Sequence, residues 1–192
     1  AALISKTIEN CFLQTYNDFD ILVYDDGSTD NTDTVIKSLQ TVYPNRIKYI
    51  KSTSNKGIGY SRNMLLKNLN TEYGVWLDSD DLMSSDRLLK CINYLESNID
   101  VDIVFSYITK FHSDNINPNE LQKSDIKINV STYNKNNYRS LHSNTACATG
   151  FFRQKLKRYN IVPLKYGSED VLWLWQLLNA GINIGQISEP LY

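Results

Sequence analysis

The chain has 192 residues, of which 42% are hydrophobic and 21% are charged, so it suits a single globular domain over 1–192. Its formal net charge of −1 provides no basic field for a nucleic-acid backbone, which argues against a nucleic-acid partner. The cysteines lack a paired spacing, and neither a bilayer-length apolar segment nor a basic-then-apolar leader occurs, so we expect a cytoplasmic protein.

Helical and strand patterns alternate through the first half of the chain. Apolar residues at helical spacing predict the helices, and short runs rich in strand formers predict the strands. In chain order they predict a helix over 4–14, a strand over 19–24, a helix between 29 and 44, a strand over 47–51, a helix after 59, a strand over 73–77, a helix after 86 and a strand over 101–107. This alternation predicts crossover units and an α/β fold, with a mainly parallel sheet and helices on both faces.

The pattern is weaker in the second half of the chain. Polar residues dominate 109–144, which we interpret as a surface insertion containing a short strand near 126–130. Beyond the insertion we expect a strand over 146–152, a short basic helix over 153–159, a buried helix from 167 and a strand over 184–187.

Two of the predicted strands end in acidic turns. Asp25 and Asp26 follow the first strand, and Asp78, Asp80 and Asp81 follow the apolar run at 73–77. Because the carboxyl ends of parallel strands meet at one edge of a sheet, we expect both turns to line one cleft. Carboxylates there can hold a divalent cation that receives a nucleotide diphosphate, or they can simply form turns leading to helix caps. The residues alone leave both interpretations open.

Other residues and motifs in the chain bear on which kind of site the acidic turns form. Lys56 and Arg62, between the two acidic turns, can contact phosphates or can be ordinary solvated charges. An EF-hand is excluded, since Leu82 and Met83 occupy positions that need an oxygen ligand and a glycine. A P-loop, a dinucleotide-binding fingerprint and a nucleophile elbow are all absent from the sequence.

Several segments together resemble the family 2 glycosyltransferases of GT-A fold, which is Rossmann-like. The segments are QTY at 14–16, DFDILVYDDGSTDNTD at 18–33, NKGIGYSRN at 55–63, LDSDD at 77–81 with Asp86 and Arg87, and the pair Glu169 and Asp170. The resemblance covers nearly the whole chain in the family's own motif order. It implies metal-dependent, inverting transfer of a hexose or N-acetylhexosamine from a UDP-sugar to a hydroxyl of a glycan or lipid-linked acceptor, as in bacterial polysaccharide synthesis.

The resemblance also implies how the donor is held, with a nucleotide-sugar-binding half at 1–108 and an acceptor-side half at 109–192. Asp26 would contact the base, commonly uracil, with Asp25 beside it. Arg62 and Lys56 would face the nucleotide or its diphosphate.

The family's DxD motif corresponds to Asp78 and Asp80. The resemblance implies that Asp80 is the direct ligand of Mn²⁺ or Mg²⁺. Asp78 would lie nearer the ribose or sugar and would also be a candidate metal ligand, and Ser79 between them would belong to the nucleotide-sugar site.

A second acidic pair is assigned to catalysis by the resemblance. Asp170 matches the position of the family's catalytic base, and Glu169 lies beside it. Both residues begin a predicted helix, so without the resemblance helix capping and macrodipole stabilisation explain them better. Inversion at an anomeric carbon requires one carboxylate to take the acceptor's proton while a cation neutralises the departing diphosphate. Asp170 can supply that carboxylate, and Asp78 and Asp80 can hold that cation.

One departure from the family concerns its first strand, whose turn helps hold the base. We find no counterpart, so we expect the sequence to begin after that strand. Two alternative functions remain, a sugar nucleotidyltransferase and a non-catalytic module that binds a nucleotide or glycan. The first would need a Gly-rich N-terminal loop, which is not found. A lipid-linked acceptor would be compatible with peripheral association at the inner face of a membrane, and no oligomeric state is predicted.

Overall fold

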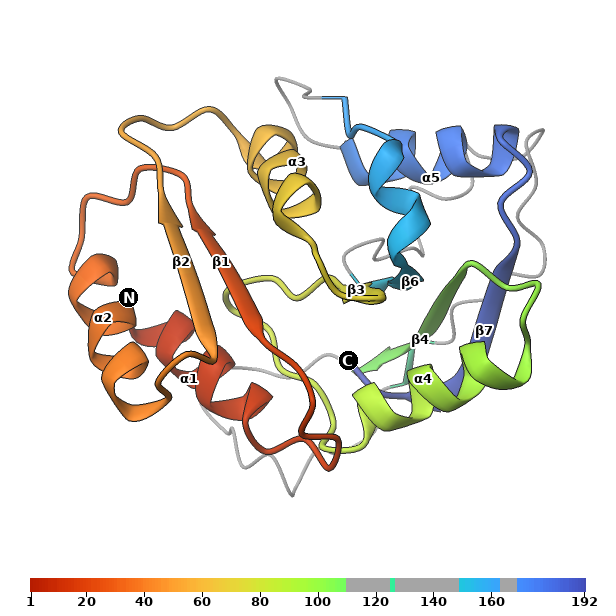
Figure 1. The fold of residues 1–192 in the computed structure, drawn as a ribbon, viewed down its shortest axis with the longest axis horizontal. Helices are drawn as coiled ribbons and strands as arrows, with labels where there is room; N and C mark the ends of the chain where they lie inside the picture. Colours follow the sequence, from red (N-terminus) through yellow and green to blue (C-terminus); the bar gives the residue numbers. More distant parts are fainter. Residues whose placement is uncertain (110–124, 127–148, 163–168) are drawn as a thin grey trace.

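The structure is a computed structural model, which describes residues 1–109, 125–126, 149–162 and 169–192 (Figure 1). Helices and strands alternate over much of the chain. They are α1 (Ala2–Cys11), β1 (Ile21–Asp25), α2 (Thr32–Val42), β2 (Ile47–Lys51), α3 (Ile58–Asn68), β3 (Tyr73–Val75), α4 (Arg87–Ser97), β4 (Ile103–Thr109), β5 (Asp125–Ile126), β6 (Phe151–Arg153), the 3₁₀ helix η5 (Gln154–Arg158), α5 (Glu169–Asn179) and β7 (Ile184–Pro190).

The first two strands form a parallel ladder of their own. Ile21 of β1 pairs with Ile47 of β2, and the register continues to Asp25 and Lys51. Side chains alternate across this ladder, as the period of a strand requires. Ile21 and Val23 pack with the apolar residues of α1 and α2. Tyr24 instead contacts Tyr60 of α3, with ring centroids 6.2 Å apart, so helices lie on both faces.

The second sheet is mixed, which corrects the expectation of a mainly parallel sheet. Its strands run in the order β3-β6-β4-β5, with β7 also paired to β4. The pairs β3–β6, β6–β4 and β4–β5 are antiparallel, and β4–β7 is parallel. The physical reason is that β6, from the second half of the chain, lies between β3 and β4 and runs against both. Two ladders among the described residues therefore replace the single sheet that the alternation predicted.

Helices cover both faces of this mixed sheet, as predicted. One face packs against α3 and α5, through a cluster that includes Leu66, Phe152 and Trp173. The other packs against α4, through Leu95, Val104 and Phe151 among others. Phe151 and Phe152, adjacent on β6, face opposite sides of the sheet. The end of β3 and the start of α5 are thereby held near α3, as Figure 1 shows.

Candidate functional site

Three of the predicted site residues meet in one buried ion-pair network. Arg62 of α3 is only 7% exposed, and its guanidinium lies over the ring of Trp76 at 5.9 Å. Arg62 Nη1 donates to Glu169 Oε1 at 2.7 Å, and Arg62 Nη2 donates to Asp78 Oδ1 at 3.1 Å. Glu169 begins α5, whereas Asp78 follows β3. The network therefore joins three separate segments around one guanidinium.

The loop after β3 that contains Asp78, Asp80 and Asp81, here called the acidic loop, holds these carboxylates in different environments. Ser79 and Asp80 are exposed, and the Asp80 carboxylate has no hydrogen bond or ion pair within the described residues. Asp78 is partly buried, with a side chain 38% exposed. Asp80 is thus the carboxylate most accessible to a ligand from solvent.

Asp81, at the end of this loop, is held by the protein. Tyr192 Oη donates a 2.6 Å hydrogen bond to Asp81 Oδ2, and the Asp78 backbone N–H donates to Tyr192 Oη at 3.4 Å. Burial raises the pKa of Asp81, and the negative charges of Asp80 and Asp78 raise it further against the opposing effect of the Tyr192 hydrogen bond. These contacts give Asp81 a structural role in the loop.

A buried polar stripe on α1 and the turn after it supports the acidic loop. Thr7, Asn10 and Gln14 recur at intervals of three and four residues, and all three are buried. Their side chains bond the backbone of 79–88. The bonds are Thr7 Oγ1 to Ser79 O (3.1 Å), Asn10 Nδ2 to Met83 O (3.1 Å), Met83 N to Asn10 Oδ1 (2.9 Å), Gln14 Nε2 to Ser84 O (2.6 Å) and Leu88 N to Gln14 Oε1 (3.0 Å).

The apolar positions of the first helix, on which its prediction depends, do not reveal this stripe. The helical spacing of the three polar side chains was a usable signal, since polar residues at that spacing share one face. Only their burial distinguishes them from an ordinary solvated face.

Asp25, at the end of β1, is buried and fully engaged by the protein. Tyr49 Oη donates to Asp25 Oδ2 at 2.6 Å, and the Ser28 backbone N–H donates to Asp25 Oδ1 at 2.7 Å. Burial by itself would raise the pKa of Asp25, but these hydrogen bonds outweigh it and hold the pKa below its usual value. The carboxylate therefore braces the turn after β1.

Asp26 links that turn to the loop that precedes α3. Asp26 Oδ1 accepts from the Lys56 backbone N–H at 2.9 Å, and Asp26 Oδ2 accepts from the Gly57 backbone N–H at 2.7 Å. The exposed Lys56 ammonium lies 4.7 Å from the ring centroid of Tyr60. Contact of Asp26 with a base, and of Lys56 with a phosphate, stay predictions.

Asp170 lies beside Glu169 in the first turn of α5. Its Oδ1 accepts from the backbone N–H of Val171 at 2.8 Å, and its carboxylate has no cationic partner in the part of the chain that the structure describes. Glu169 is buried and paired with Arg62, so the two adjacent carboxylates have different surroundings. Asp170 is the one that is free to interact with a ligand.

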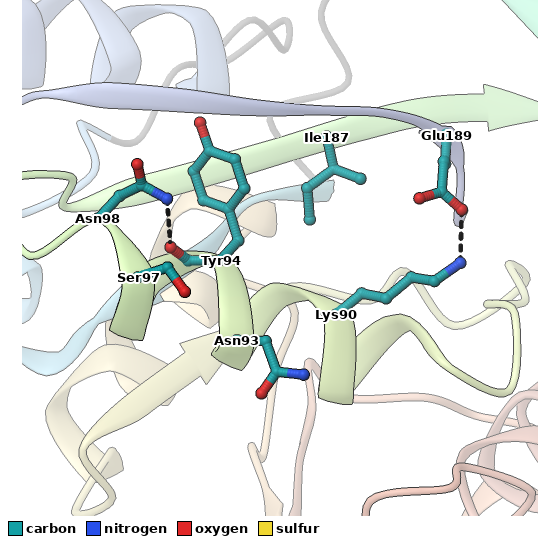
Figure 2. A pocket seen from close by; sticks show the side chains of 7 residues that line it. All are labelled: Lys90, Asn93, Tyr94, Ser97, Asn98, Ile187 and Glu189. Atoms are coloured by element: carbon teal, nitrogen blue, oxygen red, sulfur yellow. Dashed lines mark hydrogen bonds and ion pairs between the residues drawn. The ribbon is translucent and has the colours of Figure 1, made fainter.

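A hollow of about 340 Å³ lies elsewhere, between α4 and β7. Figure 2 shows Lys90 and Tyr94 of α4 on one side of it and Ile187 and Glu189 of β7 on the other. Lys90 pairs with Glu189 across the hollow. The pKa of Lys90 is raised, mainly by its hydrogen bond to Asp86 and next by its hydrogen bond to Glu189. None of the predicted site residues lines this hollow, so it is separate from the acidic loop.

The α/β fold with its mixed sheet is that of the GT-A glycosyltransferases. The chain belongs to glycosyl transferase family 2, whose family description matches residues 1–159. This family falls in enzyme class EC 2.4. Within the described ranges, no helix combines the length and the apolar character that crossing a bilayer requires.

Proteins that match most of the chain include a curated relative and several solved structures. Escherichia coli WfaP is 28% identical to this chain, over 93% of this chain and 66% of the length of WfaP. WfaP is named as a UDP-Glc:α-D-GlcNAc-diphosphoundecaprenol β-1,3-glucosyltransferase. S. aureus TarS, solved with UDP-GlcNAc, matches with a TM-score of 0.76 at 20% identity over 100% of this chain and 54% of its own. The mannosyltransferase PcManGT of Pyrobaculum calidifontis, solved with GDP-Man and Mn²⁺, matches with a TM-score of 0.71 at 19% identity over 98% and 51%.

The two structural matches establish the fold alone. Seven further curated relatives, 30–35% identical over 50–57% of this chain, are longer proteins of which the match covers 15–38%. The chain therefore spans less than half of their length.

Proposed function

We propose that this chain carries out metal-dependent, inverting transfer of a hexose or N-acetylhexosamine from a UDP-sugar to a hydroxyl of a glycan or lipid-linked acceptor. The observation that carries the proposal is the convergence of Arg62, Asp78 and Glu169 in a family 2 glycosyltransferase. This network places the acidic loop and the start of α5 together, so a donor held by the loop would lie near Asp170.

The choice of UDP rests on the relatives and on the acidic turn after β1. WfaP is named for UDP-Glc, and TarS was solved with UDP-GlcNAc. PcManGT was solved with GDP-Man, so a GDP-sugar is the alternative that a donor test must include. Lys56 and the turn of Asp25 and Asp26 lie on the segments expected to meet the nucleotide.

A divalent cation suits the carboxylates of the acidic loop. No group of three or more His, Cys, Asp or Glu side chains among the described residues is arranged to hold a metal. Mg²⁺, however, is usually held by one or two carboxylates together with substrate phosphates, and PcManGT was solved with Mn²⁺. Asp80, exposed and without a hydrogen bond or ion pair in the described ranges, and the free oxygen of Asp78 fit that demand. When bound, the cation would neutralise the departing diphosphate.

Asp170 is the proposed base. Its Oδ1 is held by the Val171 N–H, and its other oxygen has no hydrogen-bond partner in the described residues. That oxygen would take the proton of the acceptor hydroxyl as the hydroxyl oxygen attacks the anomeric carbon and the nucleoside diphosphate leaves. The carboxylate must then be ionised before the reaction.

The decisive experiment is a panel of UDP- and GDP-sugars, with and without Mn²⁺, that measures nucleoside diphosphate release and the anomeric configuration of the product. We expect UDP release with inversion, lost in Asp80→Ala and Asp170→Asn but kept in Asp18→Asn, which removes an exposed carboxylate remote from the acidic loop in sequence. A retained configuration contradicts the mechanism. Release of pyrophosphate from a nucleoside triphosphate would favour the nucleotidyltransferase, and UDP binding without release from any donor would favour the non-catalytic module.

A further inference from the structure

We infer that Arg62 is a positioning residue, which orients Asp78 and fixes the first turn of α5, rather than a ligand of the donor diphosphate. The inference deepens the proposed function and rests on it. Both terminal nitrogens of the Arg62 guanidinium already donate hydrogen bonds to carboxylates of the protein. With the residue 7% exposed, little of the guanidinium is open to a phosphate arriving from solvent.

The contact with Asp78 orients a carboxylate of the acidic loop. Arg62 Nη2 holds Asp78 Oδ1, while the Asp78 backbone N–H donates to Tyr192 Oη. The side chain of Asp78 is nevertheless 38% exposed. One oxygen is thus fixed by the protein, and the carboxylate still meets the solvent from which a donor would arrive.

The contact with Glu169 fixes the start of α5. The side chain of Glu169 is 5% exposed, and it is adjacent in sequence to Asp170, the proposed base. An aromatic wall supports this contact, because Trp76 lies against the guanidinium and meets Trp173 of α5 edge-on at 6.1 Å. The fork of a guanidinium can bridge two carboxylates in this way, whereas a lysine ammonium is a single point charge.

The two possible roles of Arg62, positioning residue and diphosphate ligand, predict different kinetics for its variants. A positioning residue acts through Glu169, so the effects of changing both residues overlap and do not multiply. A diphosphate ligand would act independently of Glu169 and would mainly raise the KM for the donor.

The test is a double-mutant cycle of Arg62→Lys, Glu169→Gln and the double variant, with Lys67→Gln, an exposed cation of the same helix, as the control. We expect each single variant to lower kcat about tenfold and the double variant by about the same factor. A double variant reduced about a hundredfold overturns the inference. So does an Arg62→Lys variant whose KM for the UDP-sugar rises about tenfold while its kcat is unchanged.

A readout without substrate distinguishes failure of this inference from failure of the proposed function. Hydrogen exchange of the α5 amides at 173–176, which donate to the carbonyls of the first turn, should be faster in Arg62→Lys and Glu169→Gln than in wild type, and unchanged in Lys67→Gln. Unchanged exchange in both network variants overturns the inference even if transfer is observed. Faster exchange in a protein that releases UDP from no donor would instead sink the proposed function and leave the positioning role of Arg62 supported.

Discussion

The hydroxyl of Tyr192 lies 2.6 Å from Asp81 Oδ2, while its ring lies 4.8 Å from the guanidinium of the fully buried Arg87. Arg87 Nη2 in turn donates to Thr149 O at 2.6 Å. The acidic loop is therefore anchored at its far end by a phenol that is itself held by a buried cation. This anchoring makes the stability of the loop depend on the ionisation of Asp81.

Asp81→Asn should become progressively more stable than wild type as the pH rises. Burial raises the pKa of Asp81, so the folded protein binds this proton more tightly than the unfolded chain, and wild type loses stability from about pH 3.8 up through the raised value. Asparagine cannot ionise but still accepts a hydrogen bond from Tyr192. Urea unfolding of both proteins between pH 3.5 and 7, roughly the range over which a raised carboxyl pKa acts, measures the difference. A difference that shrinks with rising pH would contradict the assignment.

Tyr49→Phe should destabilise the protein by about 1–3 kcal/mol at pH 7, since it leaves an oxygen of the buried Asp25 without its donor. Burial is the largest single effect and would raise the pKa of Asp25, but the hydrogen bonds together outweigh it and hold the pKa below its usual value, so this stabilisation is present above the ordinary carboxyl pKa. It should be lost as the pH falls through the folded value. Tyr24→Phe, whose hydroxyl makes no hydrogen bond within the described residues, is the control in urea unfolding. Equal losses in the two variants would rule out the role of Asp25.

Asn10→Ala should cost about 1–3 kcal/mol, because it leaves the N–H and C=O of Met83 without partners beneath the acidic loop. Gln14→Ala should cost a similar amount through Ser84 O and the Leu88 N–H. Glu9→Ala, an exposed position on the same helix, should change the free energy of unfolding by less than about 0.5 kcal/mol. Urea denaturation of the three variants is sufficient, and an Asn10→Ala variant as stable as Glu9→Ala would show that the stripe does not support the loop.

Gly27→Ala should be more harmful than Gly57→Ala, although both glycines have positive φ, at +82° and +90°. The left-handed region costs a non-glycine residue about 1–3 kcal/mol at either position. At Gly27 an added Cβ would also lie 2.9 Å from the backbone carbon of Ser54, whereas at Gly57 nothing lies within 4 Å. Thermal unfolding compares the two. Equal losses would mean that the close approach to Ser54 relaxes without cost.

Local patterns predicted the elements closely where one face of each is apolar. The strand expected over 47–51 is β2 with the same bounds, and the helix expected between 29 and 44 is α2. The strand expected over 73–77 is shorter, because β3 ends at Val75 and Trp76 instead packs against Phe152 and Trp173. Periodicity reports which side chains are apolar, so it locates elements but not the residue at which a ladder stops.

By itself the sequence determined the order of the elements and the acidic turns after β1 and β3, since both depend on neighbouring residues. Only the tertiary structure decided that β6 runs antiparallel between β3 and β4, because Phe151 and Phe152 pack alike in either strand direction. It likewise decided that Arg62 pairs with Glu169, 107 residues away, and that the polar face of α1 lies beneath the acidic loop. Ion pairs and buried hydrogen bonds of this kind form between segments that only the packed fold brings together, so no local pattern encodes them.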